Sequence, residues 1–407
     1  MHAAVVGAGI SGIAASAVLV SKGWSVTLLE QEKGPNQRLS FAPGLLQGRA
    51  VALLRSLAPE PGVPFEASFS SRLQNRRFLK NLRSFANKAN KNNSITESFF
   101  KFSCNILKSM LDRFGVEDER IDGLWVLLGE AEERRLSEPP EGVDVLSRLE
   151  ALEREPALSE EVPFSAALFM PDAGSSNGTF LSRQLLEQLL AAEGGRFSFR
   201  PGSRVAEILQ KSGRVAGVRL EKGGELPCDA LVLANARGAA ELLKPLGLEL
   251  PAAGLTGVTF TAEVQNAECL PASSIALPSS PFILCRTDFR IRACGRFFLG
   301  AQTEKEKKAE CNRLYDSVLG SLLNIRLVPE SIRFWSGEVD ALPDGLPAAG
   351  TTRALEGLAL SVAHADGGLS SAWGAAAICG AALSGGSAGS PAAEALQKAC
   401  SPDRFAN

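Results

Sequence analysis

One pattern in the first thirty residues constrains the fold of this 407-residue chain more than any other feature. Residues 3–6 are apolar, residues 7–12 read GAGISG with the spacing GxGxxG, and residues 13–21 are rich in alanine. A second apolar stretch, residues 25–29, ends at Glu30. This order predicts a strand, a tight turn, a helix and a second, parallel strand, which is the unit that binds dinucleotides.

Each glycine of the turn has its own physical role in such a unit. Gly7 makes the tight turn, Gly9 lets the backbone approach a pyrophosphate, and Gly12 lets the helix pack closely on the strand. The N-terminus of the helix then faces the phosphates. Glu30, 18 residues beyond Gly12, is placed to accept hydrogen bonds from a ribose hydroxyl. We therefore predict a dinucleotide site here.

The segment after Glu30 indicates which dinucleotide is bound. A nicotinamide-dependent dehydrogenase would continue promptly into a third strand–helix unit. Here the chain runs into a polar, glycine-containing loop at residues 34–44, GPNQRLSFAPG. A second loop of this kind suits the longer body of FAD, so the sequence favours FAD.

Composition excludes several other classes of protein. The 43 basic and 45 acidic residues leave a net charge of −2, which points to neither a nucleic acid nor a membrane as the main partner. The eight cysteines form no CxxC pair and only two histidines exist, so we expect free thiols and no metal site. No run reaches the roughly 20 apolar residues of a membrane-spanning helix, and we expect a cytoplasmic protein.

A basic run without an acid lies between residues 72 and 91. We interpret it as the solvated face of a helix. The alternatives are a surface for anionic lipid at the inner face of the membrane, a surface for an electron-accepting protein and, least favoured, one for RNA. The basic residues are Arg72, Arg76, Arg77, Lys80, Arg83, Lys88 and Lys91.

The middle of the chain reads as helices followed by short strands. Residues 65–113 are expected to be helical with a break at 90–93, and residues 134–156 are expected to be helical as well. Ser176 or Asn177 can cap a helix at residues 180–193. The expected strands are residues 166–171, 204–210, 215–221, 231–234, 254–264, 282–287, 289–293 and 296–301.

A second strand–loop–helix unit lies near the C-terminus. Residues 359–363 are apolar, residues 364–371 read HADGGLSS, and residues 372–383 form a helix of small side chains. The bare N–H groups at the start of that helix would face an electron-rich atom, which under a flavin would be the pyrimidine carbonyl O2.

Taken in this order, these segments resemble the D-amino-acid oxidase/dehydrogenase superfamily of flavoproteins, and within it the small-subunit type of D-amino acid dehydrogenase. The likeness spans essentially the whole chain, and its two ends are the most specific part. The segments that carry it are VVGAGISGIAAS, LSFAPG, EREPAL, MPDAG, LTGVTFT, DFRIRACG, FWSG with PDGLPAAG, and AHADGGLSSAWG.

The resemblance implies an α/β fold, α+β overall, with two domains. A non-contiguous Rossmann-like FAD-binding domain would comprise residues 1–60, 176–245 and 340–400. An antiparallel-sheet substrate domain would comprise residues 61–175 and 246–339, with the flavin ring between the two.

The resemblance also implies a reaction and a set of cofactor contacts. A hydride passes from the α-carbon of an amino acid to flavin N5, and the resulting imine hydrolyses to a 2-oxo acid and ammonia. Neither histidine lies in the first FAD loop, so non-covalent FAD is expected. The residues that would contact or shape its site are Gly7, Ala8, Gly9, Ile10, Ser11, Gly12, Glu30, Gln31, Arg38, Ser40, Phe41, Ala42, Val205, Ala234, Gly345, His364, Gly368, Leu369 and Ser370.

One departure from the family concerns substrate binding. The amino acid dehydrogenases carry an arginine two residues after the Trp-Ser/Thr-Gly motif, and it grips the substrate carboxylate. Here that position is Val339, between Glu338 and Asp340. Valine cannot pair with a carboxylate, and neighbouring acids would repel one.

Three interpretations follow. The enzyme oxidises an amino acid and uses another arginine: Arg286, Arg290 or Arg292, or Arg333 if the register slips. It oxidises an amine without a free α-carboxylate, with Glu338 or Asp340 as counter-charge. Or it is a catalytically altered flavin-binding subunit. We favour amino acid oxidation, with oxygen, a quinone or a protein as electron acceptor.

Overall fold

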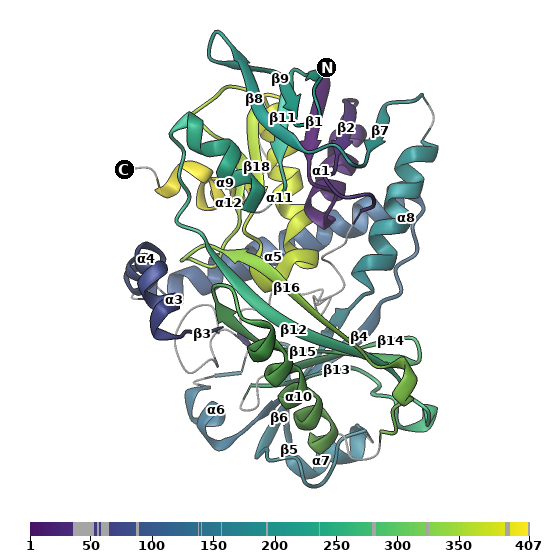
Figure 1. Ribbon diagram of the computed structural model, residues 1–407. Coiled ribbons are helices and arrows are strands. Elements are labelled where there is room, and N and C mark those ends of the chain that lie inside the picture. Colours follow the sequence, from purple (N-terminus) through teal and green to yellow (C-terminus); the bar gives the residue numbers. More distant parts are fainter. Residues whose placement is uncertain are drawn as a thin grey trace.

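The computed structural model contains two large sheets and a small third one, with helices around them (Figure 1). The described residues are 1–35, 53–54, 57, 65–86, 89–136, 138–139, 141–155, 157–192, 194–235, 237–278, 282–321, 325–386 and 391–405. Among them, the strands form a six-stranded sheet, a nine-stranded sheet and a small three-stranded sheet.

The six-stranded sheet contains the glycine turn. Apart from the antiparallel pair at one edge, β17 and β18, its strands pair in parallel. Its inner strands read as nearly continuous apolar runs because helices or a second sheet cover both faces. In order across the sheet the strands are β17 (Ala348–Thr351), β18 (Leu358–Val362), β11 (Ala230–Leu233), β1 (His2–Val6), β2 (Ser25–Leu29) and β7 (Phe197–Arg200).

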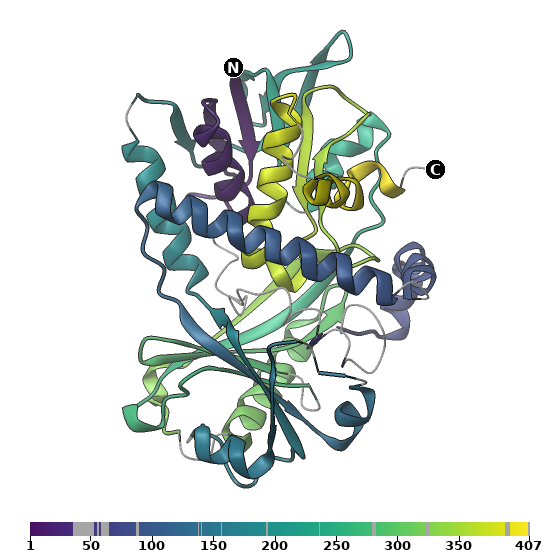
Figure 2. The same ribbon diagram turned by 180° about the vertical axis from the view of Figure 1, so that it is seen from behind.

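Helices cover one face of this sheet. α1 (Ile10–Ser21) and α11 (Gly368–Leu383) pack side by side, and α8 (Gly178–Ala191) lies beside them. The long helix α5 (Ala89–Phe114) crosses over the outer side of these helices and lies in front of them in Figure 2. Asn177 caps α8 by accepting a hydrogen bond from the backbone N–H of Phe180 at 3.3 Å, one of the two caps that the sequence allowed.

The opposite face packs against shorter elements in a separate apolar cluster. These are α9 (Arg237–Leu243) and the three-stranded sheet of β10 (Glu225–Pro227), β9 (Arg214–Leu220) and β8 (Val205–Lys211). The C-terminal elements are α12 (Pro391–Cys400) and η6 (Pro402–Phe405).

The nine-stranded sheet is mostly antiparallel, and β3 (Phe65–Glu66) pairs with β15 off its main path. α10 (Glu304–Ser321) and α7 (Arg148–Arg154) cover its face away from the six-stranded sheet (Figure 1). The other strands, in order, are β16 (Arg333–Ala341), β12 (Ala253–Glu263), β15 (Arg290–Leu299), β14 (Phe282–Thr287), β13 (Ser274–Leu277), β4 (Ile121–Leu128), β6 (Ala166–Ser175) and β5 (Asp144–Ser147).

Two short helices, α3 (Phe69–Gln74) and α4 (Arg76–Ala86), stand at the side of the molecule where the two large sheets meet (Figure 1). They carry most of the basic run. Phe78 of α4 is buried and packs against the end of the nine-stranded sheet.

Three expectations about secondary structure were wrong. Residues 134–156 are not one helix but the end of α6 (Glu130–Arg135), then β5 and α7. The two strands expected at 289–301 form the single strand β15, because Gly295 makes room for α10 and not for a turn: a Cβ there would lie 3.2 Å from the Glu310 carboxylate. α5 runs through residues 90–93, since asparagine weakens a helix only modestly and tertiary packing decides.

None of the described helices combines the length and apolarity needed to cross a bilayer. The residue boundaries of the two domains stay a prediction.

Candidate active site

A cavity of about 520 Å³ opens at the carboxyl ends of the parallel strands and extends to the end of β16. In open α/β sheets, ligands bind at this edge. Its walls come from the β1–α1 turn, the end of β2, the start of β8, the β11–α9 turn, β16 and the β18–α11 loop.

The glycine turn has the shape that a phosphate-binding turn needs. Gly7 has φ of +101°, and a Cβ there would meet the Ala234 carbonyl oxygen at 2.9 Å. A Cβ on Gly12 would lie 1.8 Å from the Gly7 carbonyl oxygen, whereas one on Gly9 meets nothing within 4 Å. α1 has no acid in its first turn. The turn therefore presents backbone N–H groups and open space to an anion at the helix N-terminus.

Glu30 lies at the end of β2, beside the same turn. One oxygen of its carboxylate accepts a hydrogen bond from the backbone N–H of Ala8 at 2.8 Å, and the other accepts one from the N–H of Glu32 at 3.0 Å. These contacts orient the carboxylate on the cavity wall and leave lone pairs for a hydroxyl donor.

Asn235 is a site residue that the sequence analysis missed. It follows β11 and lines the cavity, and its amide oxygen is buried without a hydrogen-bond partner among the described residues. Buried polar atoms of this kind are rare in proteins, and one inside a cavity fits a ligand donor. The available signal was the segment ANARG at residues 234–238, a turn directly after an apolar strand.

The β18–α11 loop holds the second histidine. Nδ1 of this residue, His364, lies 2.7 Å from the hydroxyl of Ser371, and its Nε2 lies 3.2 Å from the hydroxyl of Ser361. Burial lowers the pKa of His364 to about 4, so the imidazole is neutral at pH 7. On either side, Ala363 and Ala365 have φ of 63° and 51°, a strained conformation typical of functional loops.

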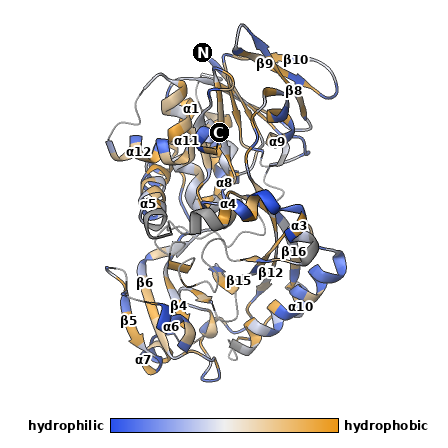
Figure 3. Ribbon diagram, turned by 90° about the vertical axis from the view of Figure 1, so that its left-hand side faces the viewer, coloured by the Kyte–Doolittle hydropathy of each residue, from blue (hydrophilic) through white to orange (hydrophobic). Residues whose placement is uncertain are grey.

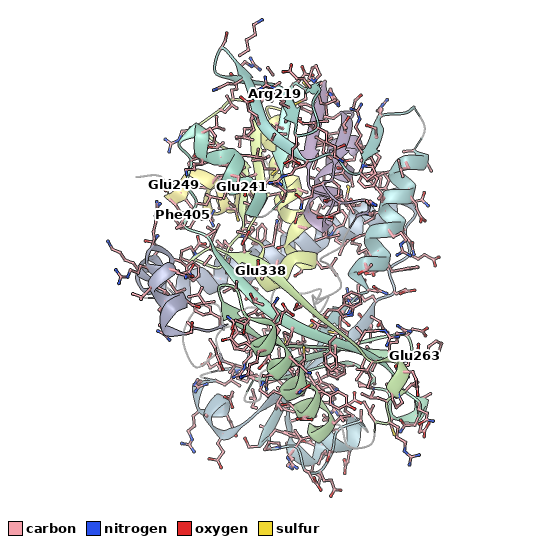
Figure 4. The ribbon with its side chains drawn as sticks, in the orientation of Figure 1. Arg219, Glu241, Glu249, Glu263, Glu338 and Phe405 are labelled. Atoms are coloured by element: carbon pink, nitrogen blue, oxygen red, sulfur yellow. The ribbon has the colours of Figure 1, made fainter. Side chains whose placement is uncertain are left out.

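The end of β16 brings the other sheet to the cavity. Glu338, Val339 and Asp340 line it, and Ala341 forms a bridge to His364. Figure 4 shows Glu338 on β16 at the level between the two large sheets. The cavity therefore joins the dinucleotide pattern of one sheet to a wall formed by the other.

None of the four candidate arginines lines the cavity, and three of them are engaged elsewhere. Arg290 pairs with Glu263, at the far end of β12 from Glu338 (Figure 4). Arg286 donates to the carbonyl oxygens of Asp288 and Pro271, and Arg333 donates to those of Glu330 and Ile332.

Arg292 differs from the others in the face that it occupies. Its neighbours Ile291 and Ala293 pack in the cluster beneath α10, so Arg292 points to the opposite face of the sheet. It is paired with Thr261 in register, whereas Val339 is paired with Leu255. Six residues of strand span roughly 20 Å, so Arg292 lies far from Val339.

The predicted cofactor residues fall into three groups. Ala8, Gly12, Gly345 and Ser370 do not line the cavity, and Arg38, Ser40, Phe41 and Ala42 lie outside the described residues. The residues that line it are Gly7, Gly9, Ile10, Ser11, Glu30, Gln31, Val205, Ala234, His364, Gly368 and Leu369.

Further residues of the cavity wall were not predicted at all. Arg204 lies 3.6 Å from a carboxylate oxygen of Glu221 and 3.4 Å from one of Glu241, so its charge is already shared. Within the described part of the chain, no three His, Cys, Asp or Glu side chains gather as metal ligands would.

Residues 2–381 match the sequence model of the DAO family, described as FAD dependent oxidoreductase. The chain belongs to this family. The match covers nearly the whole chain, and the glycine turn, the cavity and the orphaned amide of Asn235 fit the cofactor that the family binds. The six-stranded sheet, whose strands come from segments far apart in the sequence, is thus the Rossmann-like part of this FAD-dependent oxidoreductase.

Individual relatives agree with the family assignment. A D-amino acid dehydrogenase of Rhodopseudomonas palustris (strain HaA2) is 27% identical over 409 residues, covering 93% of each chain. One of Rhizobium johnstonii (strain DSM 114642 / LMG 32736 / 3841) is 25% identical over 410 residues, covering 95% of this chain and 96% of the relative.

Solved structures share the fold. Glycine oxidase from Geobacillus kaustophilus superimposes with a TM-score of 0.74 at 18% identity, over 100% of this chain and 99% of that one. L-proline dehydrogenase from P. horikoshii gives a TM-score of 0.71 at 14% identity, over 99% and 97% of the two chains.

Proposed function

We propose that this FAD-dependent oxidoreductase oxidises the C–N bond of an amino acid or a closely related amine, giving a 2-oxo acid and ammonia when the substrate is an amino acid. The observation that carries the proposal is the single cavity that joins the glycine turn to the end of β16. A substrate held against β16 would lie beside the end of a dinucleotide bound at the turn. The D-amino acid dehydrogenases named above support the choice of donor.

FAD, when bound, supplies the hydride acceptor. The chain's own residues supply its binding and the position of the donor. The N–H groups of the glycine turn would hold the pyrophosphate and Glu30 a ribose hydroxyl, while the N-terminus of α11 would stabilise negative charge. A neutral His364 adds no positive charge at this end of the cavity. Positioning of the C–H bond matters more here than proton transfer.

Anaerobic reduction tests this function. The FAD-loaded protein is mixed with D-amino acids, glycine derivatives, L-proline and simple amines, and the flavin absorbance is followed without oxygen. Bleaching by a C–N donor, with release of ammonia, supports the proposal. A protein that binds FAD but is bleached by none of these donors contradicts it.

We further propose that α3 and α4 contact anionic lipid at the inner face of the membrane, where a quinone can serve as electron acceptor. Arg72, Arg76 and Lys80 are exposed, and Leu73 among them is 43% exposed. Figure 3 shows hydrophilic and hydrophobic residues alternating along α4. An exposed apolar side chain within a cationic patch is typical of helices that bind lipid surfaces.

Co-sedimentation with vesicles of phosphatidylglycerol and phosphatidylcholine tests this contact. Arg76→Glu combined with Lys80→Glu is expected to reduce binding, because each basic residue near an anionic surface contributes about 1 kcal/mol. Lys211→Glu, on the distant β8–β9 hairpin, is the matched control and should not change it. Oxygen or a protein acceptor would be favoured if the wild type does not sediment.

A further inference from the structure

We propose that the cavity wall at Val339 receives an uncharged, apolar group of the substrate, so that the preferred donor is an amine without a free carboxylate on the reacting carbon. This rests on the proposed C–N oxidation and specifies its substrate class. The donor would lie at the end of the cavity that β16 forms.

Val339 packs against a cluster of apolar side chains that come from several separate segments. It pairs across the sheet with Leu255 of β12, and its cluster includes Leu299 of β15, Phe78 of α4 and Ala365 beside His364. These four residues of the cluster are buried, while Val339 itself is only half-buried and lines the cavity. A substrate group that meets residue 339 therefore meets hydrocarbon.

A carboxylate against this wall would lose its hydration without gaining a partner from the cluster. Moving an ionised carboxylate from water into apolar surroundings is strongly unfavourable unless a cation pairs with it. An apolar group at the same place gains free energy by leaving water. The wall thus discriminates between the two kinds of substituent.

The charges nearby act in the same direction. Glu338 and Asp340 flank Val339 on β16 and also line the cavity. The carboxylates of Glu30, Glu32 and Glu241 line its other parts. Like charges at short range repel each other, and the one arginine among the described residues of the wall, Arg204, is already shared between Glu221 and Glu241. An anionic substituent is therefore disfavoured.

Two arginines of the nine-stranded sheet lie too far away to change this preference, and a third, Arg296 of β15, is already paired with Glu66 and Glu310. Arg333 is six residues from Val339 on the same strand, and Arg292 is paired six residues away along β12, roughly 20 Å in each case. An α-carboxylate is one bond from the reacting carbon. It cannot be held at that distance while the carbon stays at the flavin end of the cavity.

A pair of isosteric ligands tests the wall directly. Benzoate and benzamide have the same shape and differ in charge, and binding of each to the FAD-loaded protein is measured by the change in flavin absorbance. We expect benzamide to bind the wild type at least roughly tenfold more tightly. Val339→Arg should reverse that order, and Val339→Leu, which keeps the wall apolar, should retain it.

The same contrast applies to substrates. D-Phenylalaninamide and 2-phenylethylamine should bleach the wild-type flavin faster than D-phenylalanine does under anaerobic conditions. This comparison uses the wild type alone and does not depend on the folding of Val339→Arg. Benzoate binding as tightly as benzamide, faster bleaching by D-phenylalanine, or no response to benzamide would each overturn the inference. If neither these three donors nor the wider panel of amino acids and amines bleaches the flavin, while benzamide is still preferred over benzoate, C–N oxidation is refuted but the apolar wall is not.

Discussion

Asn235 at the end of β11 lies directly against Gly7 in the turn after β1: a Cβ on Gly7 would come within 3.0 Å of the Asn235 Cβ. The residues are 228 positions apart in the chain, yet together they form one edge of the cavity. This contact explains why residue 7 is glycine. It also holds the amide of Asn235 where its buried oxygen has no hydrogen-bond partner within the described part of the protein.

Asn235→Ala is expected to weaken FAD binding by about 1–3 kcal/mol, the usual cost of losing a hydrogen bond to a buried polar group. The FAD-free protein should be no less stable than the wild type, because the substitution removes an unsatisfied atom. Isothermal titration with FAD and thermal melting without it measure the two effects. An unchanged FAD affinity would show that the amide does not contact the cofactor.

Gly9→Ala should impair FAD binding, whereas Gly12→Ala should impair the stability of the protein itself. A Cβ on Gly9 meets nothing within 4 Å and projects toward the place of the pyrophosphate, so the FAD-free fold should survive while FAD affinity falls at least roughly tenfold. A Cβ on Gly12 collides with the Gly7 carbonyl oxygen at 1.8 Å, so the FAD-free protein itself should be destabilised. Melting temperatures of both variants without FAD separate the two cases.

His364 should make stability depend on pH. Burial lowers its pKa to about 4 from an ordinary value of 6.5, so the folded state favours the neutral imidazole. The contribution of the neutral His364 imidazole to the free energy of unfolding is fully present above pH 6.5 and is lost as pH falls toward 4. It amounts to about 3 kcal/mol.

Urea unfolding of the FAD-free protein between pH 4 and pH 8 measures this contribution of His364 to stability. His364→Gln should lose less stability than the wild type on acidification, whereas parallel pH profiles of the two proteins would exclude His364 as the source.

Arg404 of η6 should be essential for holding the turn after β16. Its guanidinium contacts both carboxylate oxygens of Asp344, at 2.7 and 3.1 Å, and both side chains are largely buried. It also donates to the Leu346 carbonyl oxygen at 2.9 Å.

Removing one partner of a buried ion pair costs about 3–5 kcal/mol, because the other charge stays buried. Arg404→Ala and Asp344→Ala should each show a loss of that order by urea unfolding. The double variant should lose much less than the sum, and additive losses would mean that the pair is not coupled.

The dinucleotide unit could be predicted because its signals are local. Apolar runs at β1 and β2, glycine at the turn and an acid at the end of β2 lie within thirty residues, and each reflects a requirement of the backbone. The sequence could not predict β15 in the same way. Gly295 reads as a turn signal, but its actual role depends on α10, which comes later in the chain.

The substrate side was harder to predict for a related reason. The alternation of Arg290 and Arg292 correctly indicated a shared face of a strand, but not how far that face lies from the cavity. Distance across a sheet depends on strand order and register, and a strand's own residues do not specify them. Asn235 was missed because a buried orphaned atom is visible only when its surroundings are known.

The amino-acid sequence by itself therefore determined the class of cofactor and the first strand–turn–helix–strand unit, since these depend on neighbouring residues and backbone sterics. Only the tertiary structure decided which distant residues come together at the cavity: Asn235 beside Gly7, and Val339 against the apolar cluster that contains Ala365. Those contacts follow from burying apolar surface between segments far apart in the chain, and such packing leaves no periodic trace in the sequence.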